Sequence, residues 1–279
     1  MCVLCHSKYS HMSKILVTGG TGMLGKSLAN IFLNNRTDFI VGSRNSNTQT
    51  YDNKSSSIDL KNKWIRLDLT KNDQPKLNEN FDTILHLASV GPKKVDGQPG
   101  DVVLTKNLLN CIDKKQTKHL IFISIVGIDR IPFSYYQTKV QCEDLIKSSG
   151  IPYTILRATQ FHEFADALIS KLISLPIAVV PKALKIQPIQ VEAVAQELQK
   201  LTRQSPRNST YDLGGKQILT FEQLARSLLK IQNRNKFIFN LPTIGGTMKA
   251  LTNGYATCDR ISAESNTWQE YLQNKYQKH

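Results

Sequence analysis

A glycine-rich turn between an apolar strand and a helix constrains the fold of this chain more than any other feature. The β-branched segment Ile15-Leu-Val-Thr18 runs directly into Gly19-Gly-Thr-Gly22-Met-Leu-Gly25. Glycines at this spacing let the chain turn tightly, let the backbone approach a pyrophosphate, and let the helix pack close to the strand. Backbone N–H groups and the dipole at the start of the helix then attract phosphate. The turn therefore predicts a dinucleotide site in a Rossmann-type domain.

Short apolar strands and helices alternate after this turn. We expect helices at 23–33, 100–115 and 135–149, and strands at 39–41, 64–67, 83–87, 119–124 and 153–156. Continuously apolar strands are typical of a parallel sheet that is covered on both faces. The predicted fold class is therefore α/β, a doubly wound parallel sheet.

The alternation weakens after Arg157, where we expect helices only at 191–202 and 221–231 and strands at 210–213 and 237–241. We predict an NAD(P)-binding Rossmann domain over residues 13–157. Residues 158–279 should form a smaller C-terminal α/β lobe on the substrate side, packed on the same core. Residues 1–12 are expected to be a disordered leader. No apolar run is long enough for a membrane span, and no signal peptide is apparent, so we expect a cytoplasmic protein.

The glycine-rich turn also matches a second pattern. Gly20-Thr-Gly-Met-Leu-Gly25-Lys26-Ser27 fits G-x-x-x-x-G-K-[ST], the P-loop of ATPases and GTPases. Both patterns require a strand, a turn and a helix, so the local context does not separate them. A P-loop enzyme also needs a carboxylate after an apolar strand to hold magnesium. Asp68 follows a strand interrupted by Arg66, which makes it a poor candidate, and the rest of the chain favours a dinucleotide.

The end of the second strand indicates which dinucleotide is bound. An acidic residue about 20 residues beyond the glycines holds the ribose hydroxyls of NAD. Here the chain has Gly42-Ser43-Arg44-Asn45, with no acid before Asp52. A guanidinium at this position pairs with a 2′-phosphate and stacks on adenine. We therefore predict that NADP(H) is preferred over NAD(H); an ordinary surface arginine is the alternative.

Several motifs together resemble one family. The chain carries the glycine turn, Arg44, Asp68-Leu69, His86-Leu-Ala88-Ser89, Ser124-Ile-Val-Gly-Ile-Asp-Arg, Tyr135-Tyr-Gln-Thr-Lys139 and Ile155-Leu-Arg-Ala-Thr-Gln-Phe161. These motifs resemble the extended and atypical short-chain dehydrogenase/reductases, and within them the NmrA-like NAD(P)-binding proteins, which include isoflavone-reductase-like and quinone-reductase-like members. The resemblance covers nearly the whole chain from Ser13. The Tyr-x-x-x-Lys motif in the right order makes it more specific than the glycines alone.

The resemblance implies which residues contact the cofactor. Pyrophosphate contacts fall on the turn, at Gly19, Thr21, Gly22, Met23, Leu24 and Gly25. Adenosine contacts fall after the following strands, with Arg44 at the 2′-phosphate, Asp68 and Leu69 beside the adenine, and Ala88 and Ser89 beside the ribose. Lys139 is expected to hold the nicotinamide ribose.

The resemblance also implies catalysis by Ser124, Tyr135 and Lys139. Tyr135 and Lys139 lie four residues apart and so share a helix face. A neighbouring ammonium lowers the pKa of a phenol. The tyrosine would pass a proton to a substrate oxygen as hydride arrives, and Ser124 would hydrogen-bond to the same oxygen. NmrA-like proteins often lack this tyrosine, and some bind the dinucleotide without turning it over, so Tyr135 as a packing residue is the alternative.

These features predict an NADP(H)-binding oxidoreductase that transfers hydride to a small carbonyl or quinone-like substrate. The alternative is a non-catalytic NADP(H) sensor that regulates a protein partner. A sugar-nucleotide epimerase or dehydratase is a third hypothesis, weakened because we find no basic clamp for a second diphosphate.

Other features exclude further classes of function. The net charge of +14 is scattered along the chain, which favours an anionic ligand over a nucleic-acid partner. Cys2-Val-Leu-Cys5-His6 matches a haem-attachment pattern, but that chemistry requires export. No His, Cys and carboxylate set has metal-ligand spacing, so we predict no metal. We expect His86 to be a hydrogen-bonded core histidine and His162 to be a packing residue.

Overall fold

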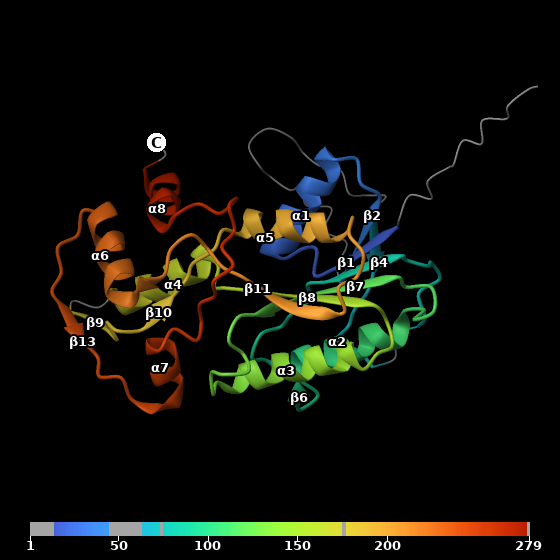
Figure 1. Cartoon of the computed structure of the whole chain (residues 1–279), viewed down its shortest axis with the longest axis horizontal. Coiled ribbons are helices and arrows are strands. Elements are labelled where there is room, and N and C mark those ends of the chain that lie inside the picture. The colour runs from blue at the N-terminus through green and yellow to red at the C-terminus, as the bar shows by residue number, and fades with distance from the viewer. Residues whose placement is uncertain (1–13, 45–62, 73–74, 175–176, 278–279) are drawn as a thin grey trace, which may run out of the picture.

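A seven-stranded parallel sheet forms the centre of the fold (Figure 1). The computed structural model describes residues 14–44, 63–72, 75–174 and 177–277. The predicted leader, residues 1–12, lies outside these residues. The sheet order is β11-β8-β7-β4-β1-β2-β3, and the bounds in that order are Ser209–Leu213, Tyr153–Ala158, His119–Ile125, Thr83–His86, Ile15–Thr18, Phe39–Ser43 and Trp64–Arg66.

Helices cover both faces of this sheet, as Figure 1 shows. On one face lie α1 (Met23–Asn34) and α5 (Val191–Leu201), which pack against each other. On the other lie α2 (Gly100–Cys111) and α3 (Ser134–Lys147). Apolar side chains of each pair are fully buried against the strands, because a sheet of buried parallel strands needs an apolar layer on each side. The predicted doubly wound α/β fold is confirmed.

The order of the strands reverses between β1 and β4, which are neighbours although far apart in the chain. Their register pairs Thr18 with His86, the last residue of each strand. The sheet continues from β1 through β2 and β3 to one edge, and from β4 through β7, β8 and β11 to the other edge. A crevice forms at the carboxyl ends of strands where such a reversal occurs, and ligands bind there.

The strand expected at 210–213 in the C-terminal lobe is β11 of the main sheet. It pairs in parallel with β8 and forms one edge of that sheet. Leu213 is buried in the same core cluster as α1 and α5, and Tyr211 packs against it. The C-terminal half of the chain thus supplies both a strand and a helix to the Rossmann layers.

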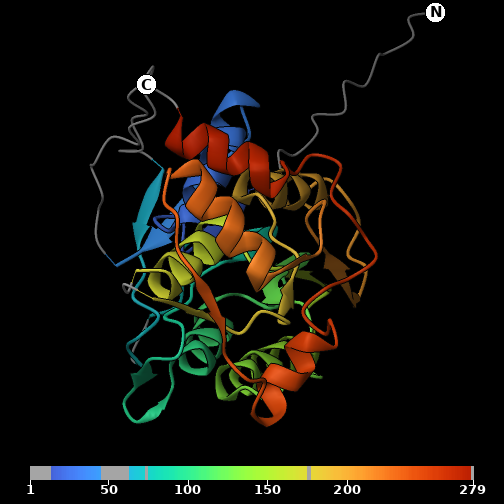
Figure 2. The same ribbon diagram turned by 90° about the vertical axis from the view of Figure 1, so that its left-hand side faces the viewer.

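The rest of the C-terminal half forms a helical lobe beside the sheet. Its helices are α4 (His162–Leu172), α6 (Phe221–Ile231), α7 (Gly245–Thr252) and α8 (Trp268–Tyr276). Figure 2, which faces this lobe, shows α4, α6 and α8 stacked, with α7 at the opposite end. Two short strand pairs connect them: β9 (Ala178–Val180) with β13 (Ile238–Asn240), and β10 (Lys185–Ile186) with β12 (Leu219–Thr220).

A buried carboxylate fastens α8 to α4. Asp166 accepts hydrogen bonds from Tyr271, Lys275 and Tyr276, and its side chain is 1% exposed.

A small hairpin of β5 (Lys94–Val95) and β6 (Gln98–Pro99) lies between β4 and α2 in the chain. Within the described ranges, every helix is too short or too polar to cross a bilayer.

Candidate functional site

The glycines of the turn are required by the close approach of the backbone. Gly19 has a left-handed backbone, with φ of +72°, and a Cβ atom there would lie 2.6 Å from the backbone nitrogen of Ala88. A Cβ atom on Gly20 would lie 2.6 Å from Val41 Cγ1, and one on Gly25 would collide with the backbone of Gly20. Side chains at these positions would push apart β1, β4 and α1. The segment therefore forms the tight strand–turn–helix that a pyrophosphate site needs.

The N-terminus of α1 faces this turn. Its N-cap is Gly22, which has extended backbone and no side chain that could satisfy the first N–H groups of the helix. No acidic residue occurs in the first turn. The N–H of Gly22 donates to Gly19 O over 3.0 Å, which closes the turn. An uncapped, acid-free helix start carries partial positive charge, so the residues present fit a phosphate group.

A cavity of about 230 Å³ opens beside the turn, at the carboxyl ends of β1, β2, β3 and β4. Most of the cofactor residues expected from the sequence line it, namely Gly19, Thr21, Gly22, Arg44, Leu69, Ala88 and Ser89. Leu24 and Gly25 are buried under the turn, with Leu24 in the apolar core. Met23 is half exposed at the helix start.

Arg44 brings a positive charge to the lining of this cavity, whereas Asp68 lies outside the lining, between Leu67 and Leu69. Arg44 is exposed at the end of β2 and lines the cavity. Burial acts to raise the pKa of Asp68, but hydrogen bonds from Thr70 and the charges of Arg44 and Lys71 outweigh it and lower that pKa. The Asp68 carboxylate holds the backbone N–H and the hydroxyl of Thr70 at 3.2 and 2.6 Å. Arg44 thus offers a guanidinium to an anion in the cavity, while Asp68 orders the separate loop that contains Thr70.

The two histidines singled out in the sequence are both buried. His86 Nδ1 lies 2.9 Å from the hydroxyl of Thr18, and its Nε2 lies 3.1 Å from that of Thr105. Burial lowers the pKa of His86 to about 3, so the ring is neutral. His162 packs its ring 5.0 Å from that of Tyr271. Among the described residues, no group of three or more His, Cys, Asp or Glu could hold a metal.

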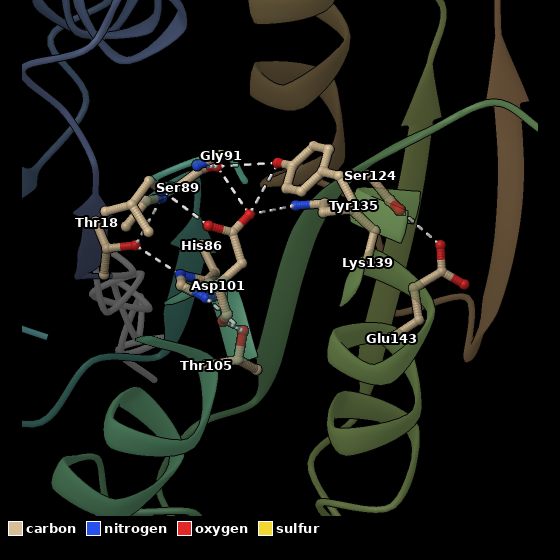
Figure 3. A network of polar contacts seen from close by, with 12 residues as sticks. Thr18, His86, Ser89, Gly91, Asp101, Thr105, Ser124, Tyr135, Lys139 and Glu143 are labelled. Atoms are coloured by element: carbon tan, nitrogen blue, oxygen red, sulfur yellow. Dashed lines mark hydrogen bonds and ion pairs between the residues drawn. The ribbon is translucent and has the colours of Figure 1, made fainter. Parts of the chain in front are cut away.

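Asp101 gathers the polar side chains next to the cavity (Figure 3). Its Oδ2 atom accepts hydrogen bonds from the hydroxyls of Tyr135, at 3.0 Å, and Ser89, at 2.8 Å. The ammonium of Lys139 lies 3.6 Å from the same oxygen. Oδ1 accepts the backbone N–H of Val90 at 2.8 Å. The structure therefore brings Tyr135, Lys139 and Ser89 together, and it does so through a residue that the sequence analysis missed.

The local sequence offered only one signal for Asp101. It is an acidic residue in the first turn of a helix that follows β4, and such residues are common because they complement the helix dipole. Its role depends on α3 lying beside α2, which the sequence alone does not reveal.

The expectation that Lys139 lowers the pKa of Tyr135 is wrong. Burial and then the charge of Asp101 raise the pKa of Tyr135 above its ordinary value. Lys139 is 4% exposed, and its charge is directed at the Asp101 carboxylate. The phenol donates to that carboxylate, and a hydrogen bond to an anion favours the protonated form.

Ser124 does not join this group. Its hydroxyl donates to Glu143 Oε1 over 2.7 Å, and Figure 3 shows it directed toward Glu143. Arg157 binds Glu143 with two nitrogens, Nε at 2.8 Å and Nη2 at 2.9 Å. Burial would raise the pKa of Glu143, but these bonds lower it. Ser124 thus belongs to a buried ion pair between α3 and β8, while Tyr135 and Lys139 face α2.

A sequence profile of an NAD(P)H-binding family matches residues 19–172. This range contains the glycine turn, the cavity residues and the Tyr135–Lys139 pair. The chain belongs to this NAD(P)H-binding family. The NAD(P)-binding family expected from the sequence is confirmed.

The chain is similar to several known proteins at low sequence identity. Agroclavine dehydrogenase of Claviceps fusiformis is 24% identical over 229 residues, which are 79% of this chain and 74% of that protein. The NADPH-dependent quinone oxidoreductase of Escherichia coli, complexed with NADPH, superposes with a TM-score of 0.73 at 17% identity, over 93% of this chain and 99% of the other. A nucleoside-diphosphate-sugar epimerase of Staphylococcus aureus gives 0.72 at 20% identity, over 93% and 99%. Reductases and epimerases share this fold, so the fold does not decide the reaction.

Proposed function

We propose that this protein is an NADP(H)-dependent oxidoreductase that reduces a small carbonyl or quinone-like compound. The observation that carries the proposal is the gathering of Tyr135, Lys139 and Ser89 on Asp101, beside the cavity that the glycine turn lines. Ser89 links the cavity to this group of side chains, because it lines the cavity and its Oγ lies 3.2 Å from the Tyr135 hydroxyl. A proton donor therefore adjoins the expected dinucleotide site.

Different residues bind the cofactor and transfer the proton in this reaction. The helix start after Gly22 would hold the pyrophosphate of the dinucleotide, and Ala88 and Ser89 would hold its ribose. A bound nicotinamide supplies the hydride. Tyr135 gives its hydroxyl proton to the substrate oxygen, which gains negative charge as the neighbouring carbon accepts the electron pair. Solvent then returns a proton to the Tyr135 oxygen, which restores the donor.

The choice of NADP(H) over NAD(H) rests on Arg44. It is exposed, it lines the cavity, and the end of β2 carries no carboxylate that would bind ribose hydroxyls. A charge-assisted hydrogen bond to a 2′-phosphate contributes about 1.5–3 kcal/mol. The complex of the E. coli quinone oxidoreductase with NADPH is in keeping with this preference.

Calorimetric titration with NADPH, NADH and ATP tests the cofactor assignment. We expect NADPH to bind most tightly. Arg44→Ala should weaken NADPH binding about 10- to 150-fold and leave NADH binding nearly unchanged. Arg203→Ala, at an exposed arginine that does not line the cavity, is the matched control. Binding of ATP without either dinucleotide would instead support the P-loop alternative.

Oxidation of NADPH in the presence of quinones and aldehydes tests the reaction. Tyr135→Phe should lower kcat by about 10²- to 10⁴-fold, because it removes the proton donor, while NADPH affinity stays nearly unchanged. Tyr136→Phe, one residue along the same helix, should keep its activity. Full activity of Tyr135→Phe would refute the role given to this hydroxyl.

One observation favours a non-catalytic NADP(H) sensor of the NmrA-like type. The hydroxyl of Tyr135 is already donated to Asp101, so the phenol is engaged within the protein. NADPH binding without oxidation by any compound of the panel would support the sensor, which would then regulate a protein partner.

A further inference from the structure

Asp101 is a buried carboxylate with several polar contacts near the proposed site. Its side chain is 2% exposed, and that of Lys139 is 5% exposed. One oxygen of the carboxylate receives two hydroxyls and faces one ammonium, while the other is fixed by the N–H of Val90. Asp101 itself lies in the first turn of α2, whereas Tyr135 and Lys139 come from α3. The carboxylate therefore joins two helices at the point where the chemistry is proposed.

We propose that Asp101 is the positioning residue of the reaction, holding Tyr135 beside Ser89 and neutralising Lys139 so that the phenol remains a protonated donor. This inference rests on the proposed function for its catalytic meaning. Its physical content, the control of Tyr135 by Asp101, is independent of turnover.

Titratable groups on three elements surround the phenol of Tyr135. Asp101 of α2 and Cys142 of α3 act on it directly, and Lys139 of α3 pairs with Asp101 at 3.6 Å. His86 of β4 is affected by both Asp101 and Lys139. The His86 ring is neutral, and burial raises the pKa of the Cys142 thiol, so neither carries charge near neutral pH. The balance at the phenol is then set by one ammonium and one carboxylate.

The carboxylate has the stronger effect because it contacts the phenol directly. The Tyr135 hydroxyl donates to Asp101 over 3.0 Å, and ionisation of the phenol would place two negative charges in contact. A Tyr–Lys pair without such a carboxylate would favour the phenolate instead. Burial acts in the same direction as Asp101 and raises the pKa of Tyr135.

The pH dependence of reduction follows from this balance. Reduction consumes the phenol proton, so activity requires protonated Tyr135. With Asp101 in place, activity should persist at alkaline pH. In Asp101→Asn the ammonium of Lys139 is no longer neutralised, so the phenol should ionise at lower pH and the alkaline limb of kcat should move down with it.

The test is an NMR titration of the full-length protein labelled with ¹³C-tyrosine. Tyr135→Phe identifies the Tyr135 resonance by its loss. We expect wild-type Tyr135 to remain protonated at about pH 10, where an ordinary tyrosine is half ionised. In Asp101→Asn its midpoint should fall by about one pH unit or more relative to wild type. Asp144→Asn, at an exposed carboxylate on α3, is the control and should match wild type.

The outcomes separate this inference from the proposed function. An inactive wild type would refute the enzyme, whereas the titration would still test Asp101. An unchanged Tyr135 midpoint in folded Asp101→Asn overturns the inference. If that variant does not fold, Asp101→Ser takes its place with the same expected and overturning results. In either case, ionisation of wild-type Tyr135 at or below the ordinary tyrosine midpoint overturns the inference.

Discussion

Replacing Ser124 with alanine separates two roles for this buried hydroxyl. The sequence motif implies a catalytic role, whereas the structure directs the hydroxyl to Glu143 at 2.7 Å. The substitution removes one charge-assisted hydrogen bond, which contributes about 1.5–3 kcal/mol to stability. Glu143 keeps its bonds to Arg157 and Lys147, so no unpaired buried charge is created and the larger cost of about 3–5 kcal/mol does not arise.

Urea denaturation and steady-state kinetics measure the two roles separately. We expect Ser124→Ala to lower the free energy of unfolding by about 1.5–3 kcal/mol. We expect kcat to change by less than about tenfold, which corresponds to less than about 1.4 kcal/mol in the activation barrier. Ser134→Ala, at an exposed serine that begins α3, controls for the loss of a hydroxyl and should change neither quantity.

The opposite pattern would refute this reasoning. A loss of about 100-fold or more in kcat is the size expected when a group that acts on the substrate is removed. If such a loss came with unchanged stability, Ser124 would have to turn from Glu143 toward the substrate during turnover.

Three further substitutions test the structure around the site. Gly19→Ala would place a methyl group 2.6 Å from the Ala88 nitrogen at a φ of +72°; calorimetry should show weaker NADPH binding, and urea denaturation a stability loss of at least about 1–2 kcal/mol. His86 has its pKa lowered from 6.5 to about 3 by burial, so the unfolded chain alone gains a proton across that range, and acidification should destabilise wild type more than His86→Gln. Asp166→Asn weakens the hydrogen bonds from three side chains of α8 and should cost about 1.5–3 kcal/mol, measured by urea denaturation.

The parts of the fold that local residues determine could be predicted from the sequence. The turn after Ile15–Thr18 could be recognised because its glycines allow a tight turn, a close approach to pyrophosphate and close packing of the helix. The helix predicted at 221–231 has the same bounds in the structure. Its apolar residues recur at helical spacing, and the structure adds a capping box of Thr220 and Gln223 at its start. The helix predicted at 100–115 ends earlier, at Cys111, where the backbone becomes extended.

Features that depend on distant partners could not be predicted in this way. The sequence gives no register between β11 and β8, which lie about fifty residues apart in the chain and pair only after folding. The helix at 162–172 was missed because its apolar residues are followed closely by Pro176, and the segment suggested only a broken apolar run.

The candidate site shows the same division between local and distant effects. The spacing of Tyr135 and Lys139 predicts correctly that they share a helix face, because that is a property of one helix. The direction of the Tyr135 pKa shift was wrong, because it depends on a carboxylate that a different helix brings into contact. The motif residues thus indicate where the site lies. The direction of the Tyr135 pKa shift is set by burial and by Asp101, which belongs to no motif.

The position of β11 has a consequence for the order in which the protein matures on the ribosome. A nascent chain that ends after Ala158 contains β8 without its partner β11. A strand with an unpaired edge can pair with another molecule. Protection comes only when Leu213 has emerged and β11 can take its place. The open edge of the sheet is therefore closed only after residue 213 of 279 has been synthesised.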